Sequence, residues 1–212
     1  MGEEGIHLLI TIEGIDGSGK STLVSALRES LKELDPVFTR EPGSTWVGEA
    51  VRRAIAERAD PVTEALLFVA DHAAHLETVV RPALEAERLV ISDRYTDSRY
   101  AYQAVMLEGR IPDPMEWLRA LHNGWTIVPD RTYLLLIPVE GAMKRLPRDK
   151  RREHFEDSSF LEKVHGNYLA LAEADPTRFV LVDALLPAGE IQQFVGKEIR
   201  ELARQPRSRR RR

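Results

Sequence analysis

The chain has 212 residues and a formal net charge of −4 at pH 7, with 43% apolar and 30% charged residues. This composition is typical of a folded protein of one domain and excludes an intrinsically disordered chain. Because the chain contains no cysteine, disulfides, thiolate metal sites and cysteine nucleophiles are excluded as well.

The C-terminal end of the chain differs from its body in charge. Residues 207–212 hold five of the 30 basic residues, which leaves 25 basic against 34 acidic residues elsewhere and a net charge of −9. An acidic body argues against a general nucleic-acid binder, so we expect a single domain over residues 1–206 and a basic, disordered tail after it. The acidic N-terminus and the lack of a long apolar run argue against a signal peptide and a membrane span, and favour a cytoplasmic protein.

The first motif in the chain is a glycine-rich loop. Residues 14–22 read GIDGSGKST and contain the pattern G-x-x-x-x-G-K-[ST], after an apolar run at residues 8–12 and before a helical pattern. Such a loop surrounds phosphates with backbone N–H groups, while Lys20 reaches the β- and γ-phosphates and the Ser21 hydroxyl ligates Mg²⁺. A glycine-rich turn that binds nothing is the alternative, and the flanking strand and helix favour the P-loop. The predicted nucleotide-binding residues are Gly14, Ile15, Asp16, Gly17, Ser18, Gly19, Lys20, Ser21 and Thr22.

Apolar runs predict strands at residues 7–13, 37–40, 89–93, 132–137 and 179–183. Helical patterns between them indicate an α/β fold, with a five-stranded, largely parallel sheet flanked by helices. Ligands of such sheets bind beyond the carboxyl ends of the strands. We therefore expect Glu13, Arg40 and Asp93, which end three of these strands, to lie at the ligand site.

Two segments after the second strand carry candidate ligand contacts. Arg40 can grip an oxyanion with its guanidinium, and Pro42 begins a turn beside it. The helical stretch at residues 62–87 is apolar on more than one face, which indicates cover by the sheet and by a second subunit. Phe68 and His72 lie four residues apart on one helix face; a place in the core is the default interpretation, and a ligand-facing pair is the alternative.

The third strand ends in Asp93 and Arg94. A carboxylate at this place in P-loop enzymes holds Mg²⁺ directly or through water. A surface salt bridge would explain each residue separately, but it would not explain why both end a strand beside a P-loop. The polar and aromatic helix that follows carries Ser98, Arg99, Tyr102 and Gln103.

A basic segment follows the fourth strand. Six of the nine residues from 144 to 152 are basic in an otherwise acidic body. A solvated face is the usual reason for such a run, but next to a P-loop we favour a short basic lid over residues 147–157 that closes over the phosphates. From residue 158 onward the chain is interpreted as scaffold.

Together these motifs resemble the thymidylate kinase family of P-loop nucleotide kinases. The resemblance covers about residues 7–200 and rests on five motifs in order. They are Glu13-Gly14-x-Asp16-Gly17-x-Gly19-Lys20-Ser21-Thr22, Thr39-Arg40-Glu41-Pro42-Gly43, Leu67-Phe68 with Ala70-Asp71, Asp93-Arg94-Tyr95 with Ser98, and Ala101-Tyr102-Gln103. A P-loop alone is shared by many families, whereas the five in this order are specific. The resemblance implies phosphorylation of dTMP to dTDP with ATP and Mg²⁺ by a homodimer.

The resemblance also implies a role for each matched residue. Ser21 and Asp93 would hold Mg²⁺, Arg145 would pack on adenine, Phe68 would stack on thymine and Tyr102 would lie against the deoxyribose. The implied catalytic residues are Lys20, Arg94, Asp16 and the lid arginines Arg148, Arg151 and Arg152. The implied acceptor-binding residues are Asp16, Arg40, Pro42, Phe68, His72, Arg94, Ser98, Arg99, Tyr102, Gln103 and Glu156.

His72 is one departure from the family pattern, which has at this position an arginine that donates to the thymine O4. His154 in the lid is another. The first change leaves a kinase for another pyrimidine nucleotide, such as dUMP, as an alternative. A P-loop protein that uses nucleotide only as a switch is the alternative outside the enzymes, although a switch needs one nucleotide site and the sequence indicates two.

Overall fold

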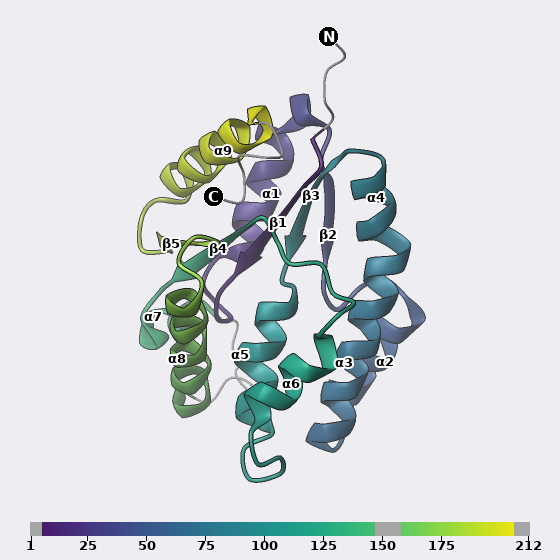
Figure 1. The fold of residues 1–212 in the computed structure, drawn as a ribbon. Coiled ribbons are helices and arrows are strands. Elements are labelled where there is room, and N and C mark those ends of the chain that lie inside the picture. Colours follow the sequence, from purple (N-terminus) through teal and green to yellow (C-terminus); the bar gives the residue numbers. More distant parts are fainter. Residues whose placement is uncertain (1–5, 147–157, 206–212) are drawn as a thin grey trace.

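The computed structural model describes residues 6–146 and 158–205 and has a parallel sheet at its centre. The five strands lie in the order β2-β3-β1-β4-β5, and every neighbouring pair is parallel (Figure 1). They are β1 (Leu8–Glu13), β2 (Val37–Arg40), β3 (Leu89–Asp93), β4 (Arg131–Leu136) and β5 (Phe179–Asp183). The predicted strands differ from these by at most one residue at either end, and the predicted parallel α/β sheet is confirmed.

Both faces of the sheet are covered, because alternate residues of a strand point to opposite sides. Leu8, Ile10 and Ile12 of β1 belong to the main core, which includes side chains of α1, α8 and α9. Leu9 of β1 packs instead with Val90 and the chain from Leu76 to Leu84. The buried strands therefore read as continuous apolar runs rather than as alternating patterns.

The helices lie between the strands in sequence and are arranged around the sheet in Figure 1. The described α-helices are α1 (Lys20–Ser30), α2 (Trp46–Glu57), α3 (Pro61–His75), α4 (Arg81–Glu85), α5 (Thr96–Met106), α6 (Pro114–His122), α7 (Val139–Arg145), α8 (Ser158–Ala174) and α9 (Ala188–Arg204). Side chains cap several of these helices: Asp60 accepts hydrogen bonds from Val62 N and Thr63 N of α3, at 3.0 and 3.1 Å, and Thr45 accepts one from Gly48 N of α2.

The long helix predicted for residues 62–87 is interrupted in the structure. Between α3 and α4 lies a π-helical turn, Leu76–Val80, so the run continues with a wider turn. Pro82 explains the widening, because proline has no N–H for the helical ladder and its ring crowds the carbonyl of the preceding turn.

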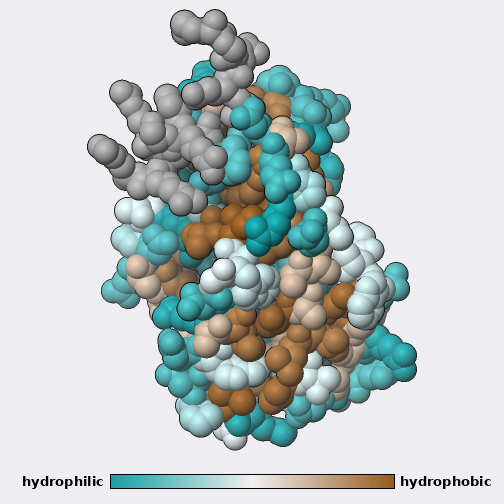
Figure 2. Space-filling model, turned by 45° about the vertical axis from the view of Figure 1, so that its right-hand side comes forward, coloured by the Kyte–Doolittle hydropathy of each residue, from teal (hydrophilic) through white to brown (hydrophobic). Residues whose placement is uncertain are grey.

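Apolar side chains are exposed on the face formed by α2 and α3. Trp46 is 78% exposed and Leu66 is 45% exposed. Figure 2, in which the right-hand side of Figure 1 is turned forward, shows apolar residues gathered over the lower half of this face. Within residues 6–146 and 158–205, no helix is both long and apolar enough to cross a membrane. The predicted lid and basic tail lie outside the described residues.

Candidate active site

The P-loop runs from the end of β1 to the start of α1 and depends on glycines. Gly17 has φ +82°, and a Cβ there would lie 2.4 Å from the carbonyl oxygen of Ala142, which leaves no room for any other residue. Gly19 has φ +100° just before α1, and among the described residues beyond its chain neighbours no atom lies within 4 Å of the place its Cβ would take. The helix N-terminus therefore faces the cavity lined by residues 16–23, where its N–H groups can receive an anion.

Lys20 is the buried cation of this loop. Its Nζ donates to the carbonyl oxygens of Gly14 and Ile15, both at 2.9 Å, and lies 3.8 Å from Asp16 Oδ1. Burial, together with the nearby Arg94 guanidinium, lowers the pKa of Lys20 to about 8. A phosphate beside Nζ would therefore supply charge compensation that the described residues provide only in part.

A cavity of about 890 Å³ lies in front of the loop. Its volume is within the range of ~300–1,000 Å³ found for ligand sites. The lining includes residues 16–23 and Arg145, whose Nη2 donates to the carbonyl oxygen of Ala184 at 3.0 Å. Arg145 thus lies on the wall of this cavity, and its contact with adenine stays a prediction.

Ser21 and Asp93 form a site that fits a hard cation. The Ser21 hydroxyl donates to Asp93 Oδ2 at 3.2 Å, and the buried Oδ1 of Asp93 has no hydrogen-bond partner among the described residues. Both side chains line the 890 Å³ cavity beside the P-loop. A hydroxyl and a carboxylate that face phosphate positions are oxygen ligands of the kind that Mg²⁺ prefers.

Arg94 lies at the junction between the end of β3 and the P-loop. Its backbone has φ +68°, and its N–H donates to Ile12 O of β1 at 3.0 Å. The guanidinium donates to Ser98 Oγ at 3.0 Å and forms an ion pair with Asp16 of the P-loop. Although burial alone would lower the pKa of Arg94, Asp16 raises it well above its ordinary value, so the group is a permanent cation.

A second, smaller cavity of about 160 Å³ lies on the other side of Arg94. Four residues line both cavities: Asp16, Glu41, Pro42 and Arg94. Phe68 and residues of α5 form its far wall. Two cavities that meet at a guanidinium and a carboxylate are suited to two ligands that react with each other at the junction.

Glu13 is a buried carboxylate that helps to position Arg94, the residue at the junction of the two cavities. Its carboxylate accepts hydrogen bonds from Tyr95 N at 2.7 Å, Ser98 Oγ at 2.6 Å and Tyr168 OH at 2.8 Å. Ser98 in turn receives the hydrogen bond from Arg94. Burial, and secondarily Asp97, raise the pKa of Glu13 to about 7, above its ordinary value. The chain from Glu13 through Ser98 thus fixes the direction of the Arg94 side chain.

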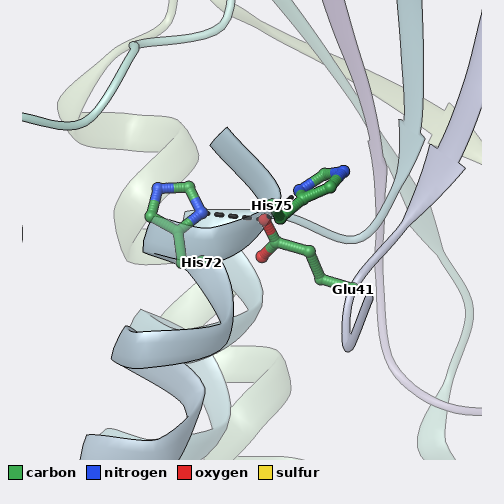
Figure 3. A group of neighbouring side chains, drawn as sticks. All are labelled: Glu41, His72 and His75. Carbon is green, nitrogen blue, oxygen red and sulfur yellow. Dashed lines mark hydrogen bonds and ion pairs between the residues drawn. The ribbon is translucent and has the colours of Figure 1, made fainter. Parts of the chain in front are cut away.

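His72 does not contact either cavity, contrary to the base contact predicted for it. The side chain is fully buried, with Nδ1 2.8 Å from Glu41 Oε1 and Nε2 2.7 Å from Thr126 Oγ1. Figure 3 shows the His72 and His75 rings on either side of the Glu41 carboxylate. The α3 face that carries His72 is turned into the core, and the ring packs 4.7 Å from that of Tyr95. The surroundings of His72 in this structure are therefore those of a core histidine, which is the default interpretation of its place in the sequence.

The other predicted site residues are mostly brought together. Arg40, Pro42, Phe68, Ser98, Arg99, Tyr102 and Gln103 line one or both cavities, as do Asp16, Gly17, Ser18, Gly19, Lys20, Ser21, Thr22, Asp93, Arg94 and Arg145. Gly14 takes part through its carbonyl oxygen, which accepts from Lys20, whereas the Ile15 side chain is buried in the core. Arg148, Arg151, Arg152, His154 and Glu156 lie outside the described residues.

Two features of the site were missed in the sequence. Ala184, Leu186, Ala188 and Ile191 line the 890 Å³ cavity, although the chain after residue 158 was interpreted as scaffold. They follow the carboxyl end of β5, so the strand-end rule used for Glu13, Arg40 and Asp93 could have found them. Glu41 also lines both cavities, although the sequence gives it no role beyond its place beside Arg40 in a motif.

Glu64 of α3 provides a test of the packing behind the smaller cavity. It is fully buried and hydrogen-bonds Gln103, and burial raises its pKa to about 7. Because the folded chain then binds this proton more tightly than the unfolded chain, the stability contribution is present below about pH 4.5 and is lost as the pH rises to about 7. Glu64→Gln should therefore raise the Tm relative to the parent by several degrees at pH 8 and by much less at pH 5, since ~1 kcal/mol shifts Tm by about 2–4 °C in a chain of this size.

Thermal melts at both pH values measure this difference. Glu77→Gln, at an exposed position of the π-helical turn, is the matched control and should leave the difference flat with pH. A Glu64→Gln variant with the same Tm difference at pH 5 and pH 8 would contradict the buried, protonated state of Glu64.

The parallel sheet, the P-loop and the two joined cavities define the protein as a P-loop nucleotide kinase. Comparison with known proteins narrows the class, because the thymidylate kinase family model matches residues 12–195. The chain belongs to the thymidylate kinase family.

Similar relatives from three organisms are each named "Probable thymidylate kinase". That of Methanoculleus marisnigri is 66% identical over 95% of this chain and 98% of its own length. The relative from Methanospirillum hungatei is 61% identical over 91% of this chain and 94% of its own length. The relative from Methanocorpusculum labreanum is 58% identical over 93% of this chain and 100% of its own length. The likeness thus extends over nearly the whole of each chain.

Proposed function

We propose that this protein phosphorylates dTMP to dTDP, with ATP as the phosphate donor and Mg²⁺ as the cofactor. The observation that carries the proposal is the pair of cavities that meet at Arg94, with the P-loop on one side and Phe68 on the other. The family membership and the names of the relatives support the same reaction. In this assignment the larger cavity takes ATP and the smaller one takes the base and sugar of the acceptor.

Phosphoryl transfer needs positioning and charge stabilisation more than a covalent nucleophile. The P-loop N–H groups and Lys20 would hold the donor phosphates, and Ser21 and Asp93 would hold Mg²⁺, which neutralises phosphate charge when bound. Arg94 would bind the acceptor phosphate at the junction, where its hydrogen bond to Ser98 and its ion pair with Asp16 aim the guanidinium. Arg148, Arg151 and Arg152 stay candidates for the lid cation that covers the transferred group.

Contacts to the acceptor follow from the wall of the smaller cavity. Phe68 would stack on the base, and Tyr102 would lie against the deoxyribose, since its hydroxyl accepts from Asp16 N at 2.9 Å and is held in place. Asp16 would contact the 3′-hydroxyl of the sugar. Glu156 stays a prediction from the sequence.

A coupled assay of ADP release with Mg-ATP and dTMP tests this function. We expect release that depends on dTMP and that stops when Mg²⁺ is removed by a chelator. The absence of dTMP-dependent release would contradict the proposal, and a higher kcat/KM for dUMP would favour the other pyrimidine nucleotide kinase. Hydrolysis of ATP that no acceptor accelerates would favour a nucleotide switch.

A homodimer and a cytoplasmic location also stay predictions. Trp46 and Leu66 support the dimer, because an exposed apolar area on one face favours association. The interface then includes α3, as the sequence predicted for residues 62–87, and light scattering of the purified chain measures the mass.

A further inference from the structure

Tyr168 of α8 is a buried tyrosine whose hydroxyl lies beside the residues that hold Arg94. Its side chain is 1% exposed and is not among the described residues that line the 890 Å³ or the 160 Å³ cavity. At this point α8 is fixed to α5, because Asn167 Nδ2 donates to the carbonyl oxygen of Ala101 at 3.0 Å. Any effect of Tyr168 on a nucleotide in these cavities therefore has to pass through its neighbours.

The Tyr168 hydroxyl closes a triangle of hydrogen-bonding groups with Ser98 and Glu13. It donates to Glu13 Oε2 at 2.8 Å and lies 2.9 Å from Ser98 Oγ, which donates to the same Oε2 at 2.6 Å. Burial, and secondarily the Glu13 charge, raise the pKa of Tyr168 well above its ordinary value, so the hydroxyl keeps its proton at physiological pH. Two hydroxyls, one from α8 and one from α5, thus meet at one carboxylate oxygen at the end of β1.

The direction of these hydrogen bonds follows from the protons that each group has. Arginine has donors only, so Ser98 Oγ accepts from Arg94 Nη1 at 3.0 Å and has one proton left to give. A charged Glu13 has acceptors only, so the protons of Ser98 and Tyr168 both run toward it. The chain from Arg94 through Ser98 to Glu13 is therefore polarised in one direction, and Tyr168 is a further donor at its end.

Tyr168 also supports Arg94 through its ring. The ring packs on that of Tyr102 in a T-shaped arrangement with centroids 6.3 Å apart, and the Arg94 guanidinium lies 5.0 Å from the centroid of Tyr102. A phenylalanine at position 168 would keep this packing and remove only the hydroxyl. The replacement therefore separates the hydrogen bonds of Tyr168 from the support by its ring.

Loss of the hydroxyl would loosen the acceptor that holds Arg94. Ser98 Oγ is held in place by the triangle and by Arg94, although a serine side chain has three staggered positions available. Without the Tyr168 hydroxyl, Ser98 loses one contact and Glu13 loses one of the three donors that the described residues offer it. Ser98 then turns more freely, and the direction of the guanidinium depends more on Asp16 alone.

We propose that Tyr168 is a positioning residue of phosphoryl transfer, whose hydroxyl fixes Ser98 and Glu13 so that they aim the Arg94 guanidinium at the phosphate of the acceptor. The proposal rests on the proposed function, in which Arg94 holds that phosphate at the junction of the two cavities. A cation that is aimed in advance costs no reorganisation when the reaction occurs. Because the effect passes through Arg94, it should exist only while Arg94 is present.

The test measures the phosphate contact in Tyr168→Phe and in the parent. Equilibrium binding of dTMP and of thymidine, which lacks the phosphate, is measured by calorimetry without ATP at pH 8, where Glu13, with a pKa of about 7, is charged. The ratio of the two dissociation constants isolates the phosphate contact. We expect Tyr168→Phe to lower this preference for dTMP about three- to tenfold, the size of one hydrogen bond, with thymidine binding unchanged. The kcat with dTMP should fall by a similar factor while the KM for ATP stays the same.

The Arg94→Ala background separates positioning from a structural role. Without a guanidinium at position 94, Ser98 has nothing to aim, so the further change Tyr168→Phe should alter the preference and kcat by less than about twofold. A merely structural role of Tyr168 would give the same loss in both backgrounds. Tyr133→Phe removes the hydroxyl of another fully buried tyrosine, which lies beside Glu198 of α9, and this matched control should change neither quantity.

The outcomes separate this inference from the proposed function. If dTMP is phosphorylated and Tyr168→Phe keeps the preference of the parent, the role of Tyr168 is wrong. Equal weakening of dTMP and thymidine, or an equal loss in the Arg94→Ala background, shows a structural role and also overturns it. If the preference falls only where Arg94 is present but the parent does not turn over dTMP, the kinase assignment fails and the positioning by Tyr168 stands. A parent that binds dTMP no more tightly than thymidine, or binds neither, overturns the inference, because Arg94 then holds no phosphate.

Discussion

Replacing Lys20 with methionine should lower kcat/KM for ATP by about 10²–10³-fold, the range found when one charge-stabilising donor is removed from a transition state. The Nζ group lies at the N-terminus of α1, 2.9 Å from two P-loop carbonyl oxygens, where the donor phosphates would displace it from at least one of them. Methionine keeps the apolar stem of the side chain. The loss is therefore expected in ATP binding and transfer rather than in folding.

The lowered pKa of Lys20, about 8, supports the expectation for stability. A buried ammonium whose pKa is depressed destabilises the folded chain in its charged form, so its removal should shift Tm by no more than about 4 °C. Calorimetry with ATP alone and with dTMP alone measures the two cavities separately. Lys20→Met should weaken only ATP. Lys32→Met, at an exposed lysine that follows the end of α1 and pairs with Glu29, should weaken neither nucleotide. Full ATP affinity in Lys20→Met would show that the P-loop lysine does not hold the phosphates.

The fold and the P-loop side of the site could be predicted because their signals are local. The P-loop is contiguous, and its glycines, lysine and serine fix one backbone shape in which a strand precedes and a helix follows. The strand-end rule found Arg40, Asp93 and Arg94 without a structure, because parallel strands in register bring their carboxyl ends to one edge. In the structure Asp93 pairs with Ile12 on one side and with Arg40 on the other.

The position of His72 could not be predicted from the local sequence pattern. Helical periodicity placed it on the same face as Phe68, but it could not give the rotation of that face relative to the cavity. Phe68 reaches the cavity, whereas His72, one turn further along, is packed against Tyr95 and Trp125 with ring centroids 4.7 and 5.3 Å away. One helical turn therefore separates a residue that lines the cavity from a residue in the core. Which of the two reaches the cavity depends on how α3 packs on the rest of the chain.

The pairing of Glu41 with Arg99 shows another limit. The two residues are 58 positions apart, and neither pattern around them requires the other. Arg99 was predicted to bind substrate as one of several polar residues on α5, but its ion pair with Glu41, which also contacts His72 and His75, emerges only when α3, α5 and the segment after β2 are packed together. The apolar wall after β5 was missed for a simpler reason, since Ala184 and Leu186 carry no chemical group that signals a site.

Arg94→Ala should lower kcat with dTMP by about 10³-fold or more, within the range of ~10³–10⁵ for an arginine that stabilises a transferring phosphoryl group. Arg94 is the cation shared by both cavities, and its guanidinium is oriented by Asp16 and Ser98 rather than by solvent. Alanine has the same difficulty with φ +68° as arginine, so the backbone of the turn gains no relief and no new strain. The change therefore removes the guanidinium with little other effect.

Arg94→Lys distinguishes charge from geometry at this position. Lysine keeps the positive charge but cannot contact Ser98, Asp16 and a phosphate with one planar group, so we expect it to recover less than a tenth of the lost kcat. Thermal melts should stay within about 4 °C of the parent, because the Arg94–Asp16 pair is only partly buried. Arg88→Ala, which removes a half-buried arginine paired with Asp35, should leave kcat unchanged.

Binding data then separate Arg94 from Lys20. Because Arg94 would hold the acceptor phosphate and Lys20 the donor phosphates, Arg94→Ala should weaken dTMP in calorimetry and leave ATP nearly unchanged, the reverse of Lys20→Met. An Arg94→Ala protein with near-parent kcat would remove Arg94 from the reaction, and the transfer would then depend on cations outside the described residues, among them Arg148, Arg151 and Arg152. An equal loss of both nucleotides would instead mean that Arg94 acts by holding the P-loop through Asp16.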